Sequence, residues 1–333
     1  MSGHNLISAG ILGTGKSIPE KVLNNFDLEK MVDTSNEWII KRTGISERHI
    51  LDKNKPLHEL GIEAAKAALE DAKIKPEELD LIIVATETPD YLAPVMSCLI
   101  QRGLSAYNSA AFDLNAACTG FVYSLTVADK FIRTGFYKHI LIVCCESLSR
   151  IVDWEDRNTC VLFGDAAGAA VVGPVENGFG IIHSCIGAEG NLAHNITIPC
   201  CYISEDDINK RPTGKRMTVW MDGSEVFKFA VRIMASATEQ VLKDMNLTLD
   251  DVKIIIPHQA NIRIIDGASK RLGISQDKVY SNVDKYGNTS SASIPVALNE
   301  ALSEGRISKG DNVVLVGFGG GLTWGATLIK WAV

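Results

Sequence analysis

Cys118 is the residue of this sequence best placed for covalent chemistry. An apolar run at 110–112 predicts a strand before it, small residues surround it, and 121–125 continues as a helix. A helix N-terminus stabilises a thiolate by about 0.3–2 kcal/mol. At about 1.4 kcal/mol per unit, this predicts a thiol pKa lowered from about 8.5 towards 7. Cys118 thus fits a nucleophile, although the segment alone fits a small cysteine packed in a crowded turn equally well.

Two further polar side chains follow buried strands in the second half of the chain. His258 follows the run 254–256, and Asn288 lies in a second strand-to-helix turn at 286–293. A lone histidine is usually a hydrogen-bonded core residue, and a lone asparagine is often a turn or cap residue. A cysteine, a histidine and an asparagine that all lie at strand ends instead predict a catalytic site, because α/β folds place their chemistry there.

A glycine-rich turn near the C-terminus supplies candidate oxyanion donors. The stretch 317–325 follows the apolar strand expected at 313–316. Glycines permit close backbone approach, so exposed N–H groups can bind developing negative charge there. A tight β-turn needs the same glycines, and this stretch alone does not separate the two interpretations.

The elements that must position these residues alternate along the chain. Apolar strands separated by amphipathic helices are typical of an α/β protein with a buried, partly parallel sheet. The expected elements are helices at 60–73 and 225–245 and strands at 81–85 and 254–256. The stretch 186–222 instead combines Gly, Pro and clustered charges, which is typical of a surface excursion between strands.

These elements repeat once. An offset of 173 residues aligns the first helix and strand with the second, and it places 115–118 over 288–291. The repeat predicts a duplicated fold with two similar halves, 1–174 and 175–333. A site between such halves takes the cysteine from the first half, and the histidine, the asparagine and the glycine turn from the second.

Composition excludes several classes of protein. The 333 residues, 46% hydrophobic and 22% charged, fit a globular protein with a substantial core. The 33 basic and 40 acidic side chains give a net charge of −7, so there is no overall basic field for nucleic acid. The longest aliphatic runs, 81–84 and 140–143, are far shorter than the about 20 residues of a membrane helix.

The cysteines and the N-terminus bear on the cell compartment. None of the eight cysteines forms a C-x-x-C pair, and no histidine spacing completes a zinc site. No basic region followed by a long apolar stretch marks a signal peptide. We therefore expect a cytoplasmic protein with reduced cysteines and no bound metal.

The stretch 10–17 matches the phosphate-binding pattern G-x-x-x-x-G-K-[ST] letter for letter. That pattern needs a long helix opening at the lysine, and Pro19 followed by a polar break argues against one. We interpret the stretch as a glycine-rich turn after a first strand at 6–9, not as a nucleotide site.

Together these motifs resemble those of the β-ketoacyl-[acyl-carrier-protein] synthase III family. The resemblance covers essentially the whole chain, with the motifs in the right order. They lie at 34–45, 113–121, 163–169, 257–261, 286–290 and 317–325. The resemblance implies the duplicated thiolase fold with αβαβα layers, a homodimer, no resident cofactor, and an acyl-CoA and malonyl carrier protein as substrates.

The resemblance also implies a reaction. Cys118 takes an acyl group from acyl-CoA as a thioester. Malonyl carrier protein then loses CO2 and attacks that thioester, which gives β-ketoacyl carrier protein and begins fatty acid synthesis. His258 Nε2 and the Asn288 amide donate to the enolate, and one such donor is typically worth about 3–4 kcal/mol. The N–H groups of Cys118 and Gly320 bind the oxyanion formed at the acyl group.

Binding residues follow from the same resemblance. Trp38 and Arg157 are expected to enclose the CoA adenine by stacking and cation–π contact, and Arg42 to meet phosphate. The other substrate-binding positions correspond to Thr34, Met221, Gly223, Phe227, Asn261 and Phe318. The carrier protein is acidic, and family docking positions correspond to Lys228, Arg263 and Lys270. A merely solvated charged face would show the same pattern.

Ala93 departs from the family's acetyl-preferring members. They carry a bulky phenylalanine there, which reaches across the dimer to the partner's acyl pocket. We hypothesise that alanine deepens the pocket for branched or longer acyl primers. The stretch 199–217, with adjacent Cys200 and Cys201, matches no family motif.

Two alternatives remain open. A synthase III-like acyltransferase of secondary metabolism shares all three catalytic residues, and only its products distinguish it. A non-catalytic acyl-CoA-binding regulatory protein would bind acyl-CoA without forming a covalent adduct. The sequence identifies neither the physiological primer nor the pathway.

Overall fold

Two mixed β-sheets form the centre of the computed structural model, which describes residues 6–333. The first contains, in spatial order, β1 (Ala9–Ser17), β7 (Asp165–Pro174), β6 (Ile140–Ser147), β4 (Leu81–Ala85) and β5 (Ala110–Leu114). The second contains β11 (Ile254–Pro257), β12 (Asn312–Gly319), β13 (Thr323–Lys330) and β8 (Gly180–Ala188). Strand β4 is parallel to β5 and β6, β11 is parallel to β12, and the other pairs in these two sheets are antiparallel.

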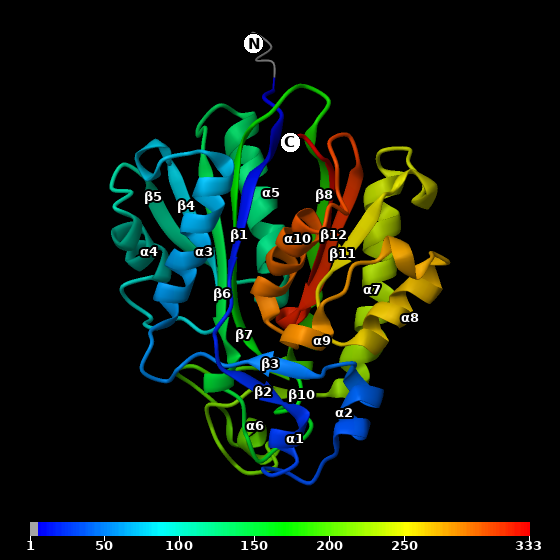
Figure 1. Ribbon diagram of the computed structural model, residues 1–333. Helices are drawn as coiled ribbons and strands as arrows, with labels where there is room; N and C mark the ends of the chain where they lie inside the picture. Colours follow the sequence, from blue (N-terminus) through cyan, green and yellow to red (C-terminus); the bar gives the residue numbers. More distant parts are fainter. Residues whose placement is uncertain (1–5) are drawn as a thin grey trace.

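Helices complete five layers around these sheets (Figure 1). Helices α3 (Leu57–Ala72) and α4 (Met96–Leu104) cover the outer face of the first sheet, and α7 (Gly223–Lys243) and α8 (Ile262–Leu272) cover that of the second. Between the sheets lie α5 (Gly120–Arg133) and α10 (Ser293–Ser303). Phe121, Leu298, Ile142 and Leu315 belong to the apolar core that joins these inner helices to both sheets. The predicted α/β fold with αβαβα layers is confirmed.

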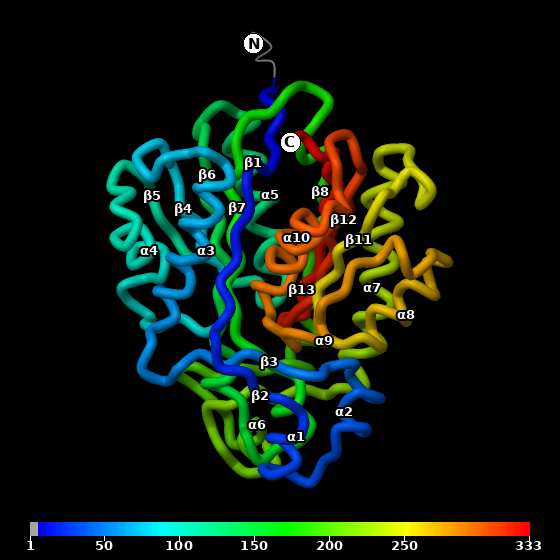
Figure 2. The backbone as a smooth tube through the Cα atoms, in the orientation of Figure 1, coloured from blue at the N-terminus to red at the C-terminus, as the bar shows by residue number. Residues whose placement is uncertain are grey.

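A base of short elements lies at one end of the two sheets (Figure 2). Its N-terminal members are β2 (Val22–Asn24), α1 (Asn25–Leu28), α2 (Asn36–Thr43) and β3 (Glu47–His49). Its later members are β9 (Ile196–Thr197), α6 (Glu205–Asn209), β10 (Trp220–Met221) and α9 (Val283–Tyr286). Leu28, Ile39 and Val219 are buried in one apolar cluster. The stretch predicted as a surface excursion therefore contributes to a packed base.

Matched backbone irregularities mark the duplication. Ala117 and Ser290 have φ values of 50° and 47°, and Lys73 and Asn246 have 57° and 54°. Non-glycine residues seldom adopt positive φ, yet both pairs are related by the offset of 173 residues. The first pair lies in the elbows before α5 and α10, and the second follows α3 and α7. The division at 1–174 and 175–333 stays a prediction.

The interpretation of residues 10–17 as a glycine-rich turn is wrong. They lie within β1, which pairs with β7. Helix α3 packs so closely on this strand that a Cβ on Gly13 would lie 2.3 Å from the backbone nitrogen of Ala72, and one on Gly15 would lie 2.3 Å from the carbonyl oxygen of Ala64. These glycines therefore permit helix–strand contact and form no phosphate cradle.

Within residues 6–333, no helix is long and apolar enough to cross a membrane. In the same part of the chain, no group of three or more His, Cys, Asp or Glu side chains is placed to hold a metal ion. Residues 1–5, on which the expectation of no signal peptide partly rests, lie outside the described residues.

Candidate active site

A cavity of about 840 Å³ lies between the base and the two elbows that begin α5 and α10. Cys118 lines it from the first half, and His258, Asn288, Phe318 and Gly320 line it from the second. Of the predicted CoA-binding residues, its lining includes Trp38, Arg42, Met221, Gly223, Phe227 and Asn261. Its lining also includes two of the predicted docking residues, Lys228 and Arg263, but not Thr34, Ala93, Arg157 or Lys270.

Cys118 lies in a short 3-10 turn, Ala117–Thr119, that leads into α5. The hydroxyl of Thr323 donates to the carbonyl of Ala116 at 2.8 Å and so ties this turn to the end of the glycine run. A Cβ on Gly319 would lie 2.6 Å from the backbone nitrogen of Cys118. The glycine run is therefore needed for the close approach of β12 to the nucleophile turn.

The predicted lowering of the Cys118 pKa is wrong. Burial, and next the charge of Glu87, raise the pKa of this thiol well above its ordinary value. Glu87 Oε1 lies 3.9 Å from Cys118 Sγ, and the Ser290 hydroxyl oxygen lies 3.2 Å from the same sulfur. Desolvation and a like charge both favour the protonated thiol, which is the opposite direction to the effect expected of a helix N-terminus. Sequence reasoning missed Glu87, which follows a different strand, β4.

A second buried carboxyl, Glu146, holds Glu87 in place. It accepts hydrogen bonds from the backbone N–H of Glu87 at 3.1 Å, from the Thr88 hydroxyl at 2.8 Å and from the Ser291 hydroxyl at 2.6 Å. Burial, and next the charge of Glu87, raise the pKa of Glu146 to about 8. Glu146 thus connects the strand ends of the first half to the second elbow.

His258 and Asn288 are each oriented by one hydrogen bond. His258 Nδ1 lies 2.7 Å from Ser293 Oγ, and its ring packs edge-on against Phe318. Asn288 Oδ1 accepts from the Ser290 N–H at 2.9 Å, which leaves its NH2 group free to donate. Burial lowers the pKa of His258 to about 3, so its imidazole is neutral. The tautomer in which Nδ1 accepts from the Ser293 hydroxyl is the one that places the ring hydrogen on Nε2.

Aromatic rings with cationic neighbours stand around the pocket. Trp38 carries the guanidinium groups of Arg42 and Arg157 over its ring, at 5.2 and 5.3 Å from the centroid. Arg263 lies 5.7 Å from the centroid of Phe227. Arg157 therefore already lies over the ring on which the adenine was predicted to stack.

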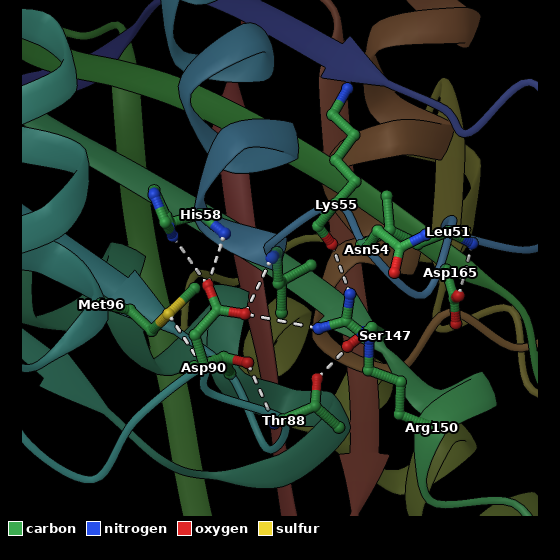
Figure 3. A network of polar contacts seen from close by, with 12 residues as sticks. Leu51, Asn54, Lys55, His58, Thr88, Asp90, Met96, Ser147, Arg150 and Asp165 are labelled. Carbon is green, nitrogen blue, oxygen red and sulfur yellow. Dashed lines mark hydrogen bonds and ion pairs between the residues drawn. The ribbon is translucent and has the colours of Figure 1, made fainter.

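Asp90 anchors the loop that joins β4 to α4 (Figure 3). Its carboxylate accepts from the N–H groups of Leu57 and His58 at 2.8 and 2.9 Å, and so caps α3. It also contacts His58 Nδ1 at 2.8 Å and pairs with Arg150 at 3.3 Å. Burial alone would raise the pKa of Asp90, but these hydrogen bonds outweigh it and the pKa lies below its ordinary value.

The Asp90→Ala variant is expected to lose about 3 kcal/mol of unfolding free energy at pH 7, because α3 loses its cap and Arg150 its partner. A carboxylate with a lowered pKa stabilises the fold above about pH 4, and the effect disappears as the pH falls through the lowered value. Urea unfolding at pH 7 and at acidic pH measures both effects. Asp250→Ala, at an exposed position, is the matched control. Equal stability of the two variants at pH 7 would contradict this role.

Two α/β halves with a cysteine, a histidine and an asparagine around one cavity define a thiolase-like condensing enzyme. Family models support this class at two places. The model for 3-oxoacyl-[acyl-carrier-protein] synthase III matches residues 112–190, and the model for its C-terminal part matches 242–331.

Known relatives match nearly the whole chain. The β-ketoacyl-[acyl-carrier-protein] synthase III of Caldanaerobacter subterraneus subsp. tengcongensis is 53% identical over 326 residues, which cover 98% of each protein. The crystal structure of 3-oxoacyl-[acyl-carrier-protein] synthase III from Aquifex aeolicus VF5 has a TM-score of 0.91 at 46% identity, over 97% of this chain and 100% of that one. The crystal structure of the priming β-ketosynthase from the R1128 polyketide biosynthetic pathway also has a TM-score of 0.91. It is 34% identical, and the match covers 100% of this chain and 98% of that one. This chain belongs to the β-ketoacyl-[acyl-carrier-protein] synthase III family, acyltransferases that initiate fatty acid synthesis.

Proposed function

We propose that this pocket performs the family's condensation with Cys118 as the nucleophile that carries the acyl group. The family uses an acyl-CoA and malonyl carrier protein as substrates. The observation that carries the residue assignment is that Cys118, His258 and Asn288 line one cavity although they come from different halves. We also propose a cytoplasmic location, where CoA thioesters are available.

In the first step, Cys118 Sγ forms a bond to the carbonyl carbon of the acyl-CoA thioester. The bond from that carbon to the CoA sulfur breaks, and CoA leaves as a thiol. Negative charge develops on the carbonyl oxygen, and in this proposal the backbone N–H groups of Cys118 and Gly320 donate to it. In support of this pairing, a Cβ on Gly320 would lie 3.5 Å from the Cβ of Ala117, so the two turns are adjacent.

In the second step, the malonyl thioester loses CO2 and an enolate forms. The hydrogen on His258 Nε2 and the NH2 group of Asn288 donate to the enolate oxygen. A neutral imidazole is suited to this role because it donates a hydrogen bond to the enolate oxygen without transferring a proton to the enolate. The carbanion attacks the acyl carbonyl carbon, the bond to Cys118 Sγ breaks, and the β-ketoacyl carrier protein leaves.

In this proposal, CoA and the carrier protein bind on the side of the pocket that is lined by Arg42, Lys228 and Arg263. Trp38 and Arg157 receive the adenine, Arg42 a phosphate, and Thr34 supports this region. Met221, Gly223, Phe227, Asn261 and Phe318 accommodate the pantetheine arm and the reacting thioesters. Lys228, Arg263 and Lys270, on α7 and α8, meet the acidic carrier protein. Lys228 also pairs with Glu225 at 2.7 Å, so its charge is partly compensated.

The Arg263→Glu variant is expected to raise the KM for malonyl carrier protein by about tenfold, equivalent to about 1.4 kcal/mol. Its kcat should change little, because Arg263 acts in docking and not in the chemical step. Steady-state kinetics with varied carrier protein measure the effect, and Lys309→Glu, which removes a charge paired with Glu176, is the control. An unchanged KM would exclude Arg263 from the docking surface.

A homodimer is proposed from the exposed edge of the first sheet. Strand β5 is an edge strand of that sheet and exposes Phe112. Nearby segments expose Tyr91, Leu92 and Tyr107, and these large apolar side chains at an open strand edge favour association. Ala93 is exposed in the same loop, next to Leu92. In the proposed dimer, Ala93 faces the acyl pocket of the partner.

The Ala93→Phe variant tests the primer pocket. Filling the space beside the partner's acyl chain is expected to slow acylation by branched and longer acyl-CoAs at least about tenfold relative to acetyl-CoA, since forcing bulk into a filled pocket costs about 1–3 kcal/mol. Acylation rates with acetyl-, isobutyryl- and hexanoyl-CoA, read by intact mass, give the preference. An unchanged preference would refute the hypothesis of a deeper pocket.

One experiment tests the proposed function as a whole. The enzyme is incubated with acyl-CoAs of different length, its intact mass is measured, and malonyl carrier protein is added. A single acyl increment on Cys118, discharged by malonyl carrier protein, is expected. An adduct that survives the chase would favour an acyltransferase of secondary metabolism with another acceptor. CoA binding without any adduct would favour the non-catalytic regulatory protein.

A further inference from the structure

Glu87 is a carboxyl group in the pocket that neither step described above uses. We propose that Glu87, with Ser290 as relay, accepts the proton of Cys118 during acyl transfer from CoA. This inference rests on the proposed role of Cys118 as the acylated residue, and it adds a catalytic residue to that step.

The contacts of the sulfur carry this inference. Among residues 6–333, the hydrogen-bond partners of Cys118 Sγ are the Ser290 hydroxyl at 3.2 Å and Glu87 Oε1 at 3.9 Å. The Ser290 hydroxyl is also hydrogen-bonded to Glu87 Oε1. A nucleophile, a hydroxyl and a carboxyl therefore form one connected group, the arrangement that activates a weak nucleophile by an adjacent base.

The electrostatics of the site create a need for such a base. Neither hydrogen-bond partner of Sγ carries positive charge, and the His258 imidazole is neutral because of its burial. The thiol is therefore protonated at rest and must lose its proton as it attacks. Burial also raises the pKa of Glu87, which makes its carboxylate a stronger proton acceptor than an exposed one.

The rest of the fold fixes the position of Glu87. Its backbone N–H is bound by Glu146, and Asp90 anchors the following part of the same loop to the start of α3 (Figure 3). Glu87 lines the cavity, so its carboxyl meets the space where the acyl-CoA thioester must lie. A base held by backbone contacts can act without reorganisation.

The step balances in protons and bonds. Cys118 Sγ bonds to the acyl carbon while its proton moves to Ser290 Oγ, and the proton of that hydroxyl moves to Glu87 Oε1. The carbon–sulfur bond to CoA breaks, and its electron pair leaves on the CoA sulfur. That thiolate then takes a proton from Glu87, which returns the carboxylate to its starting state.

Glu87→Gln is the direct test, because it keeps the shape and the hydrogen-bonding capacity but removes the base. The rate of adduct formation with acetyl-CoA is expected to fall about 10²- to 10⁴-fold, the usual contribution of a general base. Alkylation of Cys118 by iodoacetamide at fixed pH also requires loss of the thiol proton, so it should slow in the variant as well. Once fully acylated by long incubation, the variant should discharge to malonyl carrier protein at the parent's rate.

Two further variants, one in the proposed relay and one at a distant control position, ensure that the test does not rest on Glu87→Gln alone. Ser290→Ala is expected to slow acylation by a smaller factor, because Glu87 still lies close to the sulfur. Glu70→Gln, at an exposed position on α3, should change nothing. An unchanged or faster acylation of Glu87→Gln would overturn the proposal, as would an equal slowing of the discharge to malonyl carrier protein, which does not use the base. If the parent's adduct maps to a residue other than Cys118, the proposed function itself fails.

Discussion

The Cys118→Ser variant is expected to form no acyl adduct with any primer, and its condensation rate should fall by about a thousandfold or more. A hydroxyl is a far weaker nucleophile than a thiol unless a strong base activates it. The neighbouring hydroxyl and carboxyl, Ser290 and Glu87, serve a thiol whose proton is much more acidic than that of serine. Intact mass after incubation with acyl-CoA and single-turnover product formation measure the loss.

The loss of acylation can be assigned to the chemical step only if the Cys118→Ser variant still binds CoA. The CoA affinity of Cys118→Ser should stay within about twofold of the parent's, because the adenine and phosphate contacts proposed for Trp38 and Arg42 are unchanged; a twofold change is below about 0.5 kcal/mol. Cys98→Ser, which changes an exposed cysteine on α4, is the matched control and should acylate normally. A stable adduct on Cys118→Ser would locate the nucleophile elsewhere.

The fold was predictable where local pattern and tertiary packing demand the same structure. The buried strand β4 has the bounds expected from its apolar run, 81–85. Helix α7 begins two residues before the expected start at 225, because Asp222 accepts hydrogen bonds from the first backbone N–H groups and caps it there. The prediction of a turn at 10–17 was wrong, because the glycines there are needed for close contact with α3, a helix about 50 residues further along the chain, and not for a turn of their own backbone.

The site was predictable only as far as its motifs are continuous in sequence. Cys118 and His258 each follow a strand, whereas Asn288 follows the short helix α9 and not the strand expected before it; the structure places all three around one cavity. The thiol's raised pKa was not predictable, because it depends on Glu87 and on burial, and neither is visible in residues 113–121. Ile196 and Val219 also line the cavity, although they belong to the stretch 186–222 that was predicted to be a surface excursion.

The His258→Ala variant should separate the two steps. Acylation of Cys118 by acyl-CoA is expected to stay within a few-fold of the parent's rate, while decarboxylation and condensation should fall about 10²- to 10³-fold, the usual effect of losing one donor to a developing oxyanion. Release of CO2 and formation of β-ketoacyl carrier protein from pre-acylated enzyme measure the second step. Ser293→Ala, which removes the partner of Nδ1 and the acceptor of the Gln259 N–H, should cause a smaller loss, since the ring remains but is less firmly oriented.

The protonation state of His258 makes this prediction stricter. Because burial lowers its pKa to about 3, the imidazole is neutral throughout the range in which the enzyme is assayed. A lowered pKa means that the group titrates only in strong acid, so the condensation step should show no inflection from this histidine between about pH 5 and 8. If His258→Ala blocked acylation alone, or removed an inflection near neutral pH, His258 would act on the thiol and not on the enolate.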